Sequence, residues 1–103
     1  MIRHCVWFRL RPTVAATERE SIYDDLRALQ GNLDGILAMT FGRNVSPEGL
    51  GQGFADGFII DFRDTSCRDA YLVHPDHQAA GARLVAALDG GTDGLVVFDI
   101  EVN

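Results

Sequence analysis

The side chains best suited to chemistry gather in one short stretch of the sequence. Tyr71 supplies a phenol, and His74 and His77 supply imidazoles on either side of Pro75. Tyr71 and His74 are spaced to share a helical face. His77 falls in the first turn of the helix predicted after Pro75, where the helix dipole disfavours a protonated ring. A neutral imidazole there can accept a proton near pH 7, so the stretch suggests acid–base chemistry.

A third histidine, His4, interrupts an otherwise apolar strand face close to the N-terminus. One interpretation is structural: His4 is a core residue hydrogen-bonded to backbone, and Pro75 with the other histidines only caps and locks a helix break. The other interpretation is catalytic: if His4 faces the same helices, it converges with Tyr71 and His77. The spacing alone is compatible with both.

Several kinds of chemistry are excluded by residue types. All nine basic side chains are Arg, so the chain has no lysine for a Schiff base or a phosphate-binding loop. His74 and His77 have no third ligand nearby in the sequence, and Cys5 and Cys67 form no paired metal spacing. We therefore expect free thiols, no metal site and no organic cofactor.

The charge balance narrows the choice of partner. Fifteen acidic against nine basic side chains give a net charge of −6, which repels nucleic acids and anionic membranes. The N-terminus carries no apolar export segment and no run of apolar residues reaches membrane-spanning length, so a cytoplasmic protein is expected. The expected partner is a protein or a small molecule.

A chain of 103 residues suits one core, so a single domain over residues 1–103 is predicted. Thr17 and Glu20 fit a capping box for the first helix, and Thr65 or Ser66 is expected to cap the second. Strands are predicted over 2–10, 36–45, 55–62 and 95–102, and helices over 17–30, from 65 or 66 up to Pro75, and over 75–88.

This order, β-α-β-β-α-α-β, predicts an α+β ferredoxin-like fold with its second helix broken in two. Helices would cover one face of a four-stranded antiparallel sheet. The other face also carries apolar residues, among them Cys5, Trp7 and Ile59. A sheet open to water is not normally apolar on both sides, so we expect a homodimer in which two sheets pack through their open faces.

Four segments in this order resemble the stress-responsive α/β-barrel (Dabb) family. They are residues 1–4 (MIRH), 42–47 (GRNVSP), 68–77 (RDAYLVHPDH) and 96–99 (VVFD). The resemblance covers essentially the whole chain and implies a dimeric ferredoxin-like α/β barrel. Many members of that family are known mainly as stress-associated proteins.

One type of member, the olivetolic acid cyclase, closes a linear polyketide by an intramolecular aldol condensation without metal or organic cofactor. By resemblance, His77 matches its histidine base and Tyr71 its assisting tyrosine, while His4 and His74 match further histidines. The cyclase also has a bulky aromatic residue in its last helix, which the segment 75–88 lacks. A pocket of the same shape is therefore not expected.

The expected function is that of a stress-associated binding protein, a homodimer with a small-molecule cleft between helices and sheet. The expected ligand is a small apolar carbonyl or aromatic compound. The alternative is a cofactor-free, cyclase-like acid–base enzyme, in which His77 removes a proton, Tyr71 hydrogen-bonds the carbonyl oxygen, His4 orients the substrate and His74 contacts it. A cofactor-independent oxygenase or isomerase is the third class considered.

Overall fold

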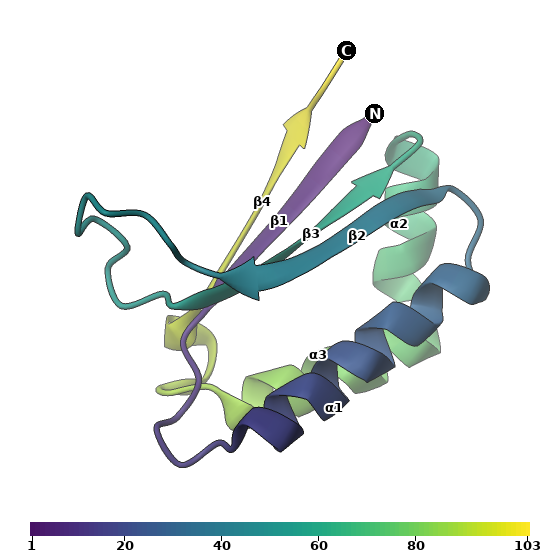
Figure 1. Ribbon diagram of the computed structural model, residues 1–103. Coiled ribbons are helices and arrows are strands. Elements are labelled where there is room, and N and C mark those ends of the chain that lie inside the picture. Colours follow the sequence, from purple (N-terminus) through teal and green to yellow (C-terminus); the bar gives the residue numbers. More distant parts are fainter.

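One four-stranded antiparallel sheet, with helices against one of its faces, organises the computed structural model, which describes residues 1–103 (Figure 1). The strands are β1 (Ile2–Phe8), β2 (Ile36–Arg43), β3 (Asp56–Phe62) and β4 (Leu95–Glu101). The helices are α1 (Ala16–Arg27), η1 (Ala28–Gly31), α2 (Thr65–Val73), α3 (Pro75–Ala87) and η2 (Gly91–Gly94). The strand order is β2-β3-β1-β4, which confirms the predicted ferredoxin-like α+β fold. In the single chain the sheet stays open and does not close into a barrel.

The core lies between the sheet and the helices. Alternate residues of β1 point toward the helices, and each is in register with a residue of β3 on the same face, as in the pairs Val6 with Phe58 and Ile2 with Phe62. Helix α1 and the η1 turn that follows it contribute the predicted stripe of buried apolar residues: Ile22 and Leu26 from α1, and Leu29 from η1. Burial of these side chains holds α1 against the sheet.

Two helix starts differ from the sequence prediction. Helix α1 begins at Ala16 after Ala15, which makes no side-chain cap, so the capping box of Thr17 and Glu20 does not form. Helix α2 is capped by Asp64, whose Oδ1 accepts a hydrogen bond from the amide of Cys67 at 2.9 Å. A carboxylate is a strong cap and also favours the positive end of the helix dipole, so it takes the place expected for Thr65 or Ser66.

The break between α2 and α3 lies at His74. Its backbone is extended (φ −68°, ψ 133°), as a residue before proline prefers, and Pro75 occupies the first turn of α3. Because His74 leaves the helix, it does not share a helical face with Tyr71. The prediction that these two side chains lie on one face was wrong for this reason.

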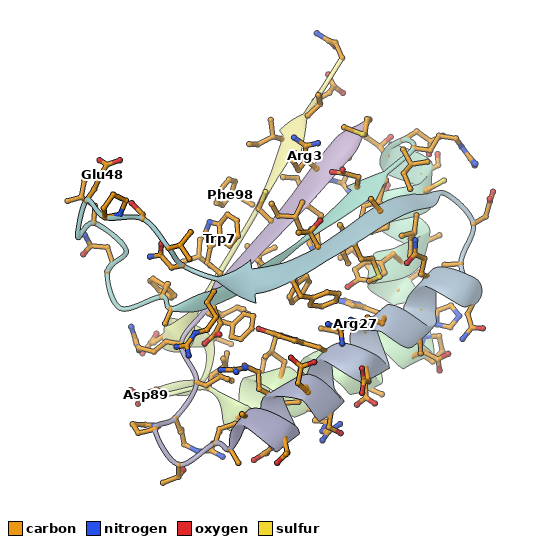
Figure 2. All side chains as sticks on the ribbon, viewed as in Figure 1. Arg3, Trp7, Arg27, Glu48, Asp89 and Phe98 are labelled. Atoms are coloured by element: carbon orange, nitrogen blue, oxygen red, sulfur yellow. The ribbon has the colours of Figure 1, made fainter.

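The face of the sheet away from the helices is apolar, as predicted. Trp7 of β1 and Phe98 of β4 make an edge-to-face contact at 6.1 Å between ring centroids on this side (Figure 2). Ile100 is 48% exposed on the same face. Arg3 and Asp61 form an ion pair there at 2.9 Å. None of the helices combines the length and the apolar character that a membrane span requires.

Candidate active site

Three ring side chains from three different elements meet between the sheet and the helices. Tyr71, buried on α2, lies with its ring centroid 4.1 Å from that of His77 on α3 and 5.8 Å from that of His4 on β1. Phe62 of β3 packs against Tyr71 at 5.1 Å. The break at Pro75 turns the chain so that His77 folds back over Tyr71. The convergence that the sequence left conditional is therefore present.

The imidazole of His77 is set up to act as a base. Its Nδ1 lies 3.2 Å from the backbone oxygen of Leu72, and because a carbonyl oxygen only accepts, Nδ1 donates. Nε2 then carries the free lone pair. Burial lowers the pKa of His77, and the nearby His4 and His74 rings lower the pKa further, against the opposing effect of the hydrogen bond to Leu72. The ring is neutral near pH 7, as predicted, but the main cause is burial and not the helix dipole.

Tyr71 is suited to donate a hydrogen bond. Only 1% of the residue is exposed, and burial raises the pKa of its phenol with no charged group contributing. The hydroxyl therefore stays protonated across the physiological range. The neutral imidazole of His77, which can accept a proton, thus lies beside the protonated hydroxyl of Tyr71, which can donate a hydrogen bond.

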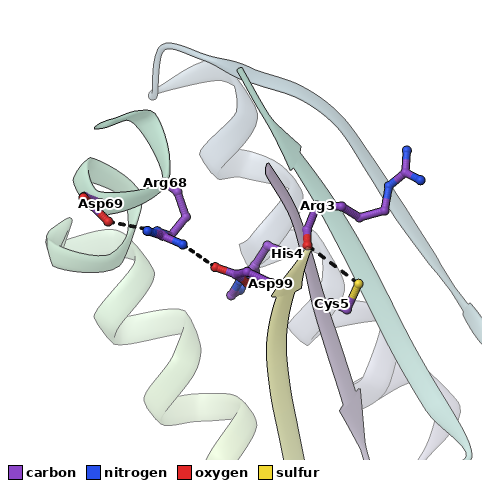
Figure 3. A network of polar contacts seen from close by, with 6 residues as sticks. All are labelled: Arg3, His4, Cys5, Arg68, Asp69 and Asp99. Atoms are coloured by element: carbon purple, nitrogen blue, oxygen red, sulfur yellow. Dashed lines mark hydrogen bonds and ion pairs between the residues drawn. The ribbon is translucent and has the colours of Figure 1, made fainter. Parts of the chain in front are cut away.

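His4 is held by a carboxylate, and not by the backbone hydrogen bond of the structural interpretation. Its Nδ1 lies 2.7 Å from Oδ1 of Asp99, whose Oδ2 accepts a hydrogen bond from Arg68 at 2.6 Å (Figure 3). Arg68 also donates to Asp69 at 2.8 Å. Burial acts to raise the pKa of Asp99, but the hydrogen bonds from Arg68 and His4 outweigh it and lower that pKa. The carboxylate is thus ionised and fixes the orientation of the His4 ring.

His74 has a structural task in the helix break. Its Nδ1 accepts a hydrogen bond from the amide of Asp76 at 3.1 Å, which makes His74 the N-cap of α3. This lone pair is consumed, so only Nε2 is left to contact a ligand. The residue thus belongs to the scaffold that places His77.

Comparison with known proteins supports the family suggested by the sequence motifs. The model of the stress responsive A/B barrel domain family, Dabb, matches residues 2–102. The chain belongs to this family. A dimeric ferredoxin-like protein of unknown function from Jannaschia sp. CCS1 is 34% identical to this Dabb chain, with 98% of each chain covered and a TM-score of 0.91.

More distant structures share the fold of this Dabb domain. A Dabb family protein from Mesorhizobium loti is 24% identical over 99% of this chain and 96% of its own, with a TM-score of 0.77. A hydroxynitrile lyase from Passiflora edulis is 18% identical over 99% and 93%, with a TM-score of 0.86. No curated protein sequence matches the chain.

Asp99 and Arg68 are members of the site that were not predicted from the sequence. A signal for Asp99 was present: in β4 it alternates onto the helix side, together with Leu95 and Val97, and it pairs in register with His4. An acid that faces the same side as a histidine directly opposite it on the neighbouring strand indicates such a pair. Arg68 comes from α2, and its reach to Asp99 depends on how the helix docks, which the sequence pattern does not encode.

Two cavities of this Dabb domain lie away from the three rings. The smaller, about 340 Å³, lies between the end of α1 and the start of α3, and the larger, about 790 Å³, lies at the open face of the sheet. Near the rings, Val97 points to the helix side of β4 yet is 51% exposed. The helices therefore leave this face of β4 open beside Asp99. No three His, Cys, Asp or Glu side chains are grouped so that they could hold a metal ion.

Proposed function

We propose that this Dabb protein binds a small apolar carbonyl compound beside Tyr71 and His77. The observation that carries the proposal is the close contact of the Tyr71 and His77 rings, with centroids 4.1 Å apart and planes tilted by 42°, with the hydroxyl protonated and Nε2 of the imidazole free. A carbonyl oxygen accepts from the phenol, and a hydroxyl or an acidic C–H of the same ligand faces Nε2. His74 contacts the ligand through Nε2, the one ring nitrogen that the helix cap leaves free.

The neutral state of His77 favours a second candidate, acid–base catalysis on such a ligand. The C–H bond next to the carbonyl breaks and its proton goes to Nε2 of His77. The electron pair of that bond forms a carbon–carbon double bond, while the π pair of the carbonyl moves onto its oxygen. The Tyr71 hydroxyl stabilises the enolate oxygen by donating a hydrogen bond. His4, held by Asp99, orients the ligand from the sheet side. Return of the proton from Nε2 to the same carbon completes an exchange. Alternatively, the enolate carbon attacks a second carbonyl, a carbon–carbon bond forms, and the resulting alkoxide takes the proton from Nε2.

Acetophenone tests both candidates because it is a small apolar aromatic ketone with methyl protons that exchange slowly in water. Binding is followed by chemical shifts of the imidazole resonances on adding acetophenone. Catalysis is followed by replacement of the methyl protons in D₂O, recorded by proton NMR. We expect saturable shifts of the His77 resonances and exchange above the buffer rate.

The variants His77→Ala and Tyr71→Phe separate the two roles. Loss of the base is expected to reduce the exchange rate about a hundredfold, and loss of the phenol about tenfold or more. Tyr23→Phe makes the same chemical change at the other buried tyrosine and should leave exchange unchanged. Chemical shift changes without proton exchange would support binding and overturn catalysis. If acetophenone causes no shift changes and no exchange, both candidates are overturned.

We also propose that the single domain, residues 1–103, forms a homodimer through the open faces of two sheets. Trp7, Phe98 and Ile100 leave apolar surface on this face, and the 34% identical Jannaschia protein is described as dimeric. Such a surface needs a partner sheet. The dimer mass in sedimentation equilibrium tests this, and Phe98→Asp should shift the equilibrium to monomer; a wild-type monomer at micromolar concentration would contradict it.

A further inference from the structure

Arg68 of α2 is joined to the candidate site through Asp99. Its guanidinium bonds Oδ2 of Asp99 at 2.6 Å, while the other oxygen of that carboxylate, Oδ1, lies 2.7 Å from Nδ1 of His4. Figure 3 shows Arg68 reaching from α2 to Asp99, with His4 beside the same carboxylate. Arg68 and His4 therefore share one negative charge and compete for it.

The contact with Asp99 determines which nitrogen of His4 carries a proton. An ionised carboxylate only accepts hydrogen bonds, so Nδ1 of His4 donates to Oδ1. Whether Nε2 also carries a proton depends on the charge that surrounds the ring. The side chain of His4 is 6% exposed, so water solvates a positive ring poorly and the ring needs a negative charge of its own to become protonated.

Arg68 takes that negative charge away from His4. A carboxylate that stands alone beside an imidazole favours the protonated ring. Here Arg68 brings a permanent positive charge to the same carboxylate. Asp69 also accepts a hydrogen bond from Arg68, at 2.8 Å, but its side chain is 66% exposed and water screens its charge. His4 thus faces a nearly neutral ion pair instead of a free carboxylate.

The other rings around His4 are neutral. Its ring centroid lies 5.8 Å from that of Tyr71 and 6.0 Å from that of Phe62, and Ile60 is its partner in register on β3. On α3 the neighbour is His77, whose pKa is lowered by burial and further by the positive charge that His4 carries when protonated. A proton on His4 would therefore make His77 a weaker base, and a neutral His4 preserves its basicity.

We propose that Arg68 is a positioning residue, which holds His4 in the neutral form with a proton on Nδ1 and a free lone pair on Nε2. This role rests on the binding function proposed above and narrows its ligand class. Nε2 of His4 is an acceptor, so the fitting ligand carries a hydroxyl group besides the carbonyl. The hydroxyl donates to His4 while the carbonyl oxygen accepts from Tyr71. The ligand class is a neutral hydroxy ketone.

Nitrogen-15 spectra of the imidazoles test the charge of His4 without any ligand. At pH 7 the wild type should show one protonated and one bare nitrogen in this ring. In Arg68→Gln we expect both nitrogens to be protonated in most molecules, and Arg68→Lys, which restores the positive charge, should restore the neutral ring. Arg83→Gln is the matched control: it breaks the ion pair with Asp25, 2.7 Å long, between α3 and α1, and should leave His4 unchanged.

Two ketones test the ligand class: hydroxymethyl phenyl ketone and its methyl ether, methoxymethyl phenyl ketone. The hydroxy ketone should bind the wild type about five- to tenfold more tightly, because the ether has no proton to donate to Nε2 of His4. In Arg68→Gln this ratio should fall to about one, since a protonated Nε2 no longer accepts. If Arg68 only stabilised the fold, its loss would weaken both ketones alike and leave the ratio unchanged.

A His4 ring protonated on both nitrogens in the wild type would overturn the role of Arg68, and this result does not depend on whether Arg68→Gln folds. A neutral ring in folded Arg68→Gln would overturn it as well. Equal binding of the two ketones to the wild type would overturn the hydroxy ketone class. If neither ketone binds, the function proposed for the site fails together with that class, whereas a change of His4 charge in Arg68→Gln would still support the role of Arg68.

Discussion

Nδ1 of His4 lies 2.7 Å from Oδ1 of Asp99, across the two neighbouring strands β1 and β4. The pair is part of a chain in which Arg68 of α2 bonds the other carboxylate oxygen. One carboxylate thus ties the edge strand, the central strand and a helix together. It also selects the orientation of an imidazole that would otherwise be a buried polar group with no fixed partner.

Asp99→Asn is expected to destabilise the protein by about 1–3 kcal/mol, because the neutral amide cannot accept both charge-assisted hydrogen bonds. Urea unfolding followed by circular dichroism measures the difference. Asp69→Asn is the control, since it touches the same Arg68 but is itself exposed and should cost about 0.5 kcal/mol or less. Equal losses in the two variants would contradict the importance of the pair.

The pH dependence of unfolding should report the same carboxylate. The pKa of Asp99 is lower in the folded protein than its ordinary value, so its stabilising contribution is present above that ordinary value and is lost as the pH falls through the folded pKa. We expect the stability of the wild type to fall more steeply than that of Asp99→Asn as the pH falls below about 4. If the free energy of unfolding, measured by urea titration, falls with pH equally steeply in the two proteins below pH 4, the protonation of Asp99 is not linked to folding.

Tyr23→Phe should leave the free energy of unfolding unchanged or raise it by about 1 kcal/mol. The Tyr23 hydroxyl is buried without a hydrogen-bond partner, and burial, with Asp56 nearby, raises its pKa to about 12. Removing an unsatisfied buried hydroxyl removes its desolvation cost while the ring keeps its contact with Phe41 at 4.8 Å. Thermal unfolding provides the measurement, and a large destabilisation would mean that the hydroxyl has a bound partner in solution.

His74→Ala is expected to cost about 1 kcal/mol because the cap on α3 is lost, whereas His74→Asn should retain most of the stability. Asparagine can accept the same amide hydrogen bond. Chemical unfolding distinguishes the two variants. If both lose stability equally, the imidazole contributes through contacts other than the cap.

Gly57→Ala should destabilise the protein by about 1–3 kcal/mol, since the new methyl group would overlap the Trp7 ring. The fluorescence of Trp7, the single tryptophan, should change in intensity and wavelength as the ring is displaced. Gly42→Ala is the companion variant and should leave both the stability and the spectrum close to those of the wild type. A spectrum that is unchanged in Gly57→Ala would show that the indole does not lie flat on this strand.

The alternation of residues in β1 and the apolar stripe of α1 were sufficient to predict the fold, because burial of a strand face and of a helix face follows directly from the periods 2 and 3.6. The helix caps were less predictable. Asp64 and Thr65 are adjacent potential caps, and the choice between them depends on where the chain leaves β3, which is a tertiary property.

For the site, the spacing of Tyr71 and His77 around a proline was informative because proline fixes where one helix ends and the next begins. The partners of His4 were not predictable in the same way. Asp99 is distant in sequence and Arg68 reaches it from another layer, so their contact depends on the packing of α2 against the edge of the sheet. The cavity at the open face depends on how a loop with several glycines folds, which residue periodicity does not determine.

Because side chains alternate along β1, each residue of this strand lies on one of the two faces of the sheet. His4 belongs to the layer of helices, while Cys5 and Trp7 belong to the opposite side. Deletion of a single residue before His4 would shift the register of β1 and turn its side chains to the opposite faces. The His4 imidazole would then lie on the open face of the sheet, and the Cys5 thiol would lie on the helix side near Tyr71. Tolerance to substitution along β1 should therefore alternate from residue to residue: one half of the strand affects the site at the histidines, and the other half affects the open face of the sheet.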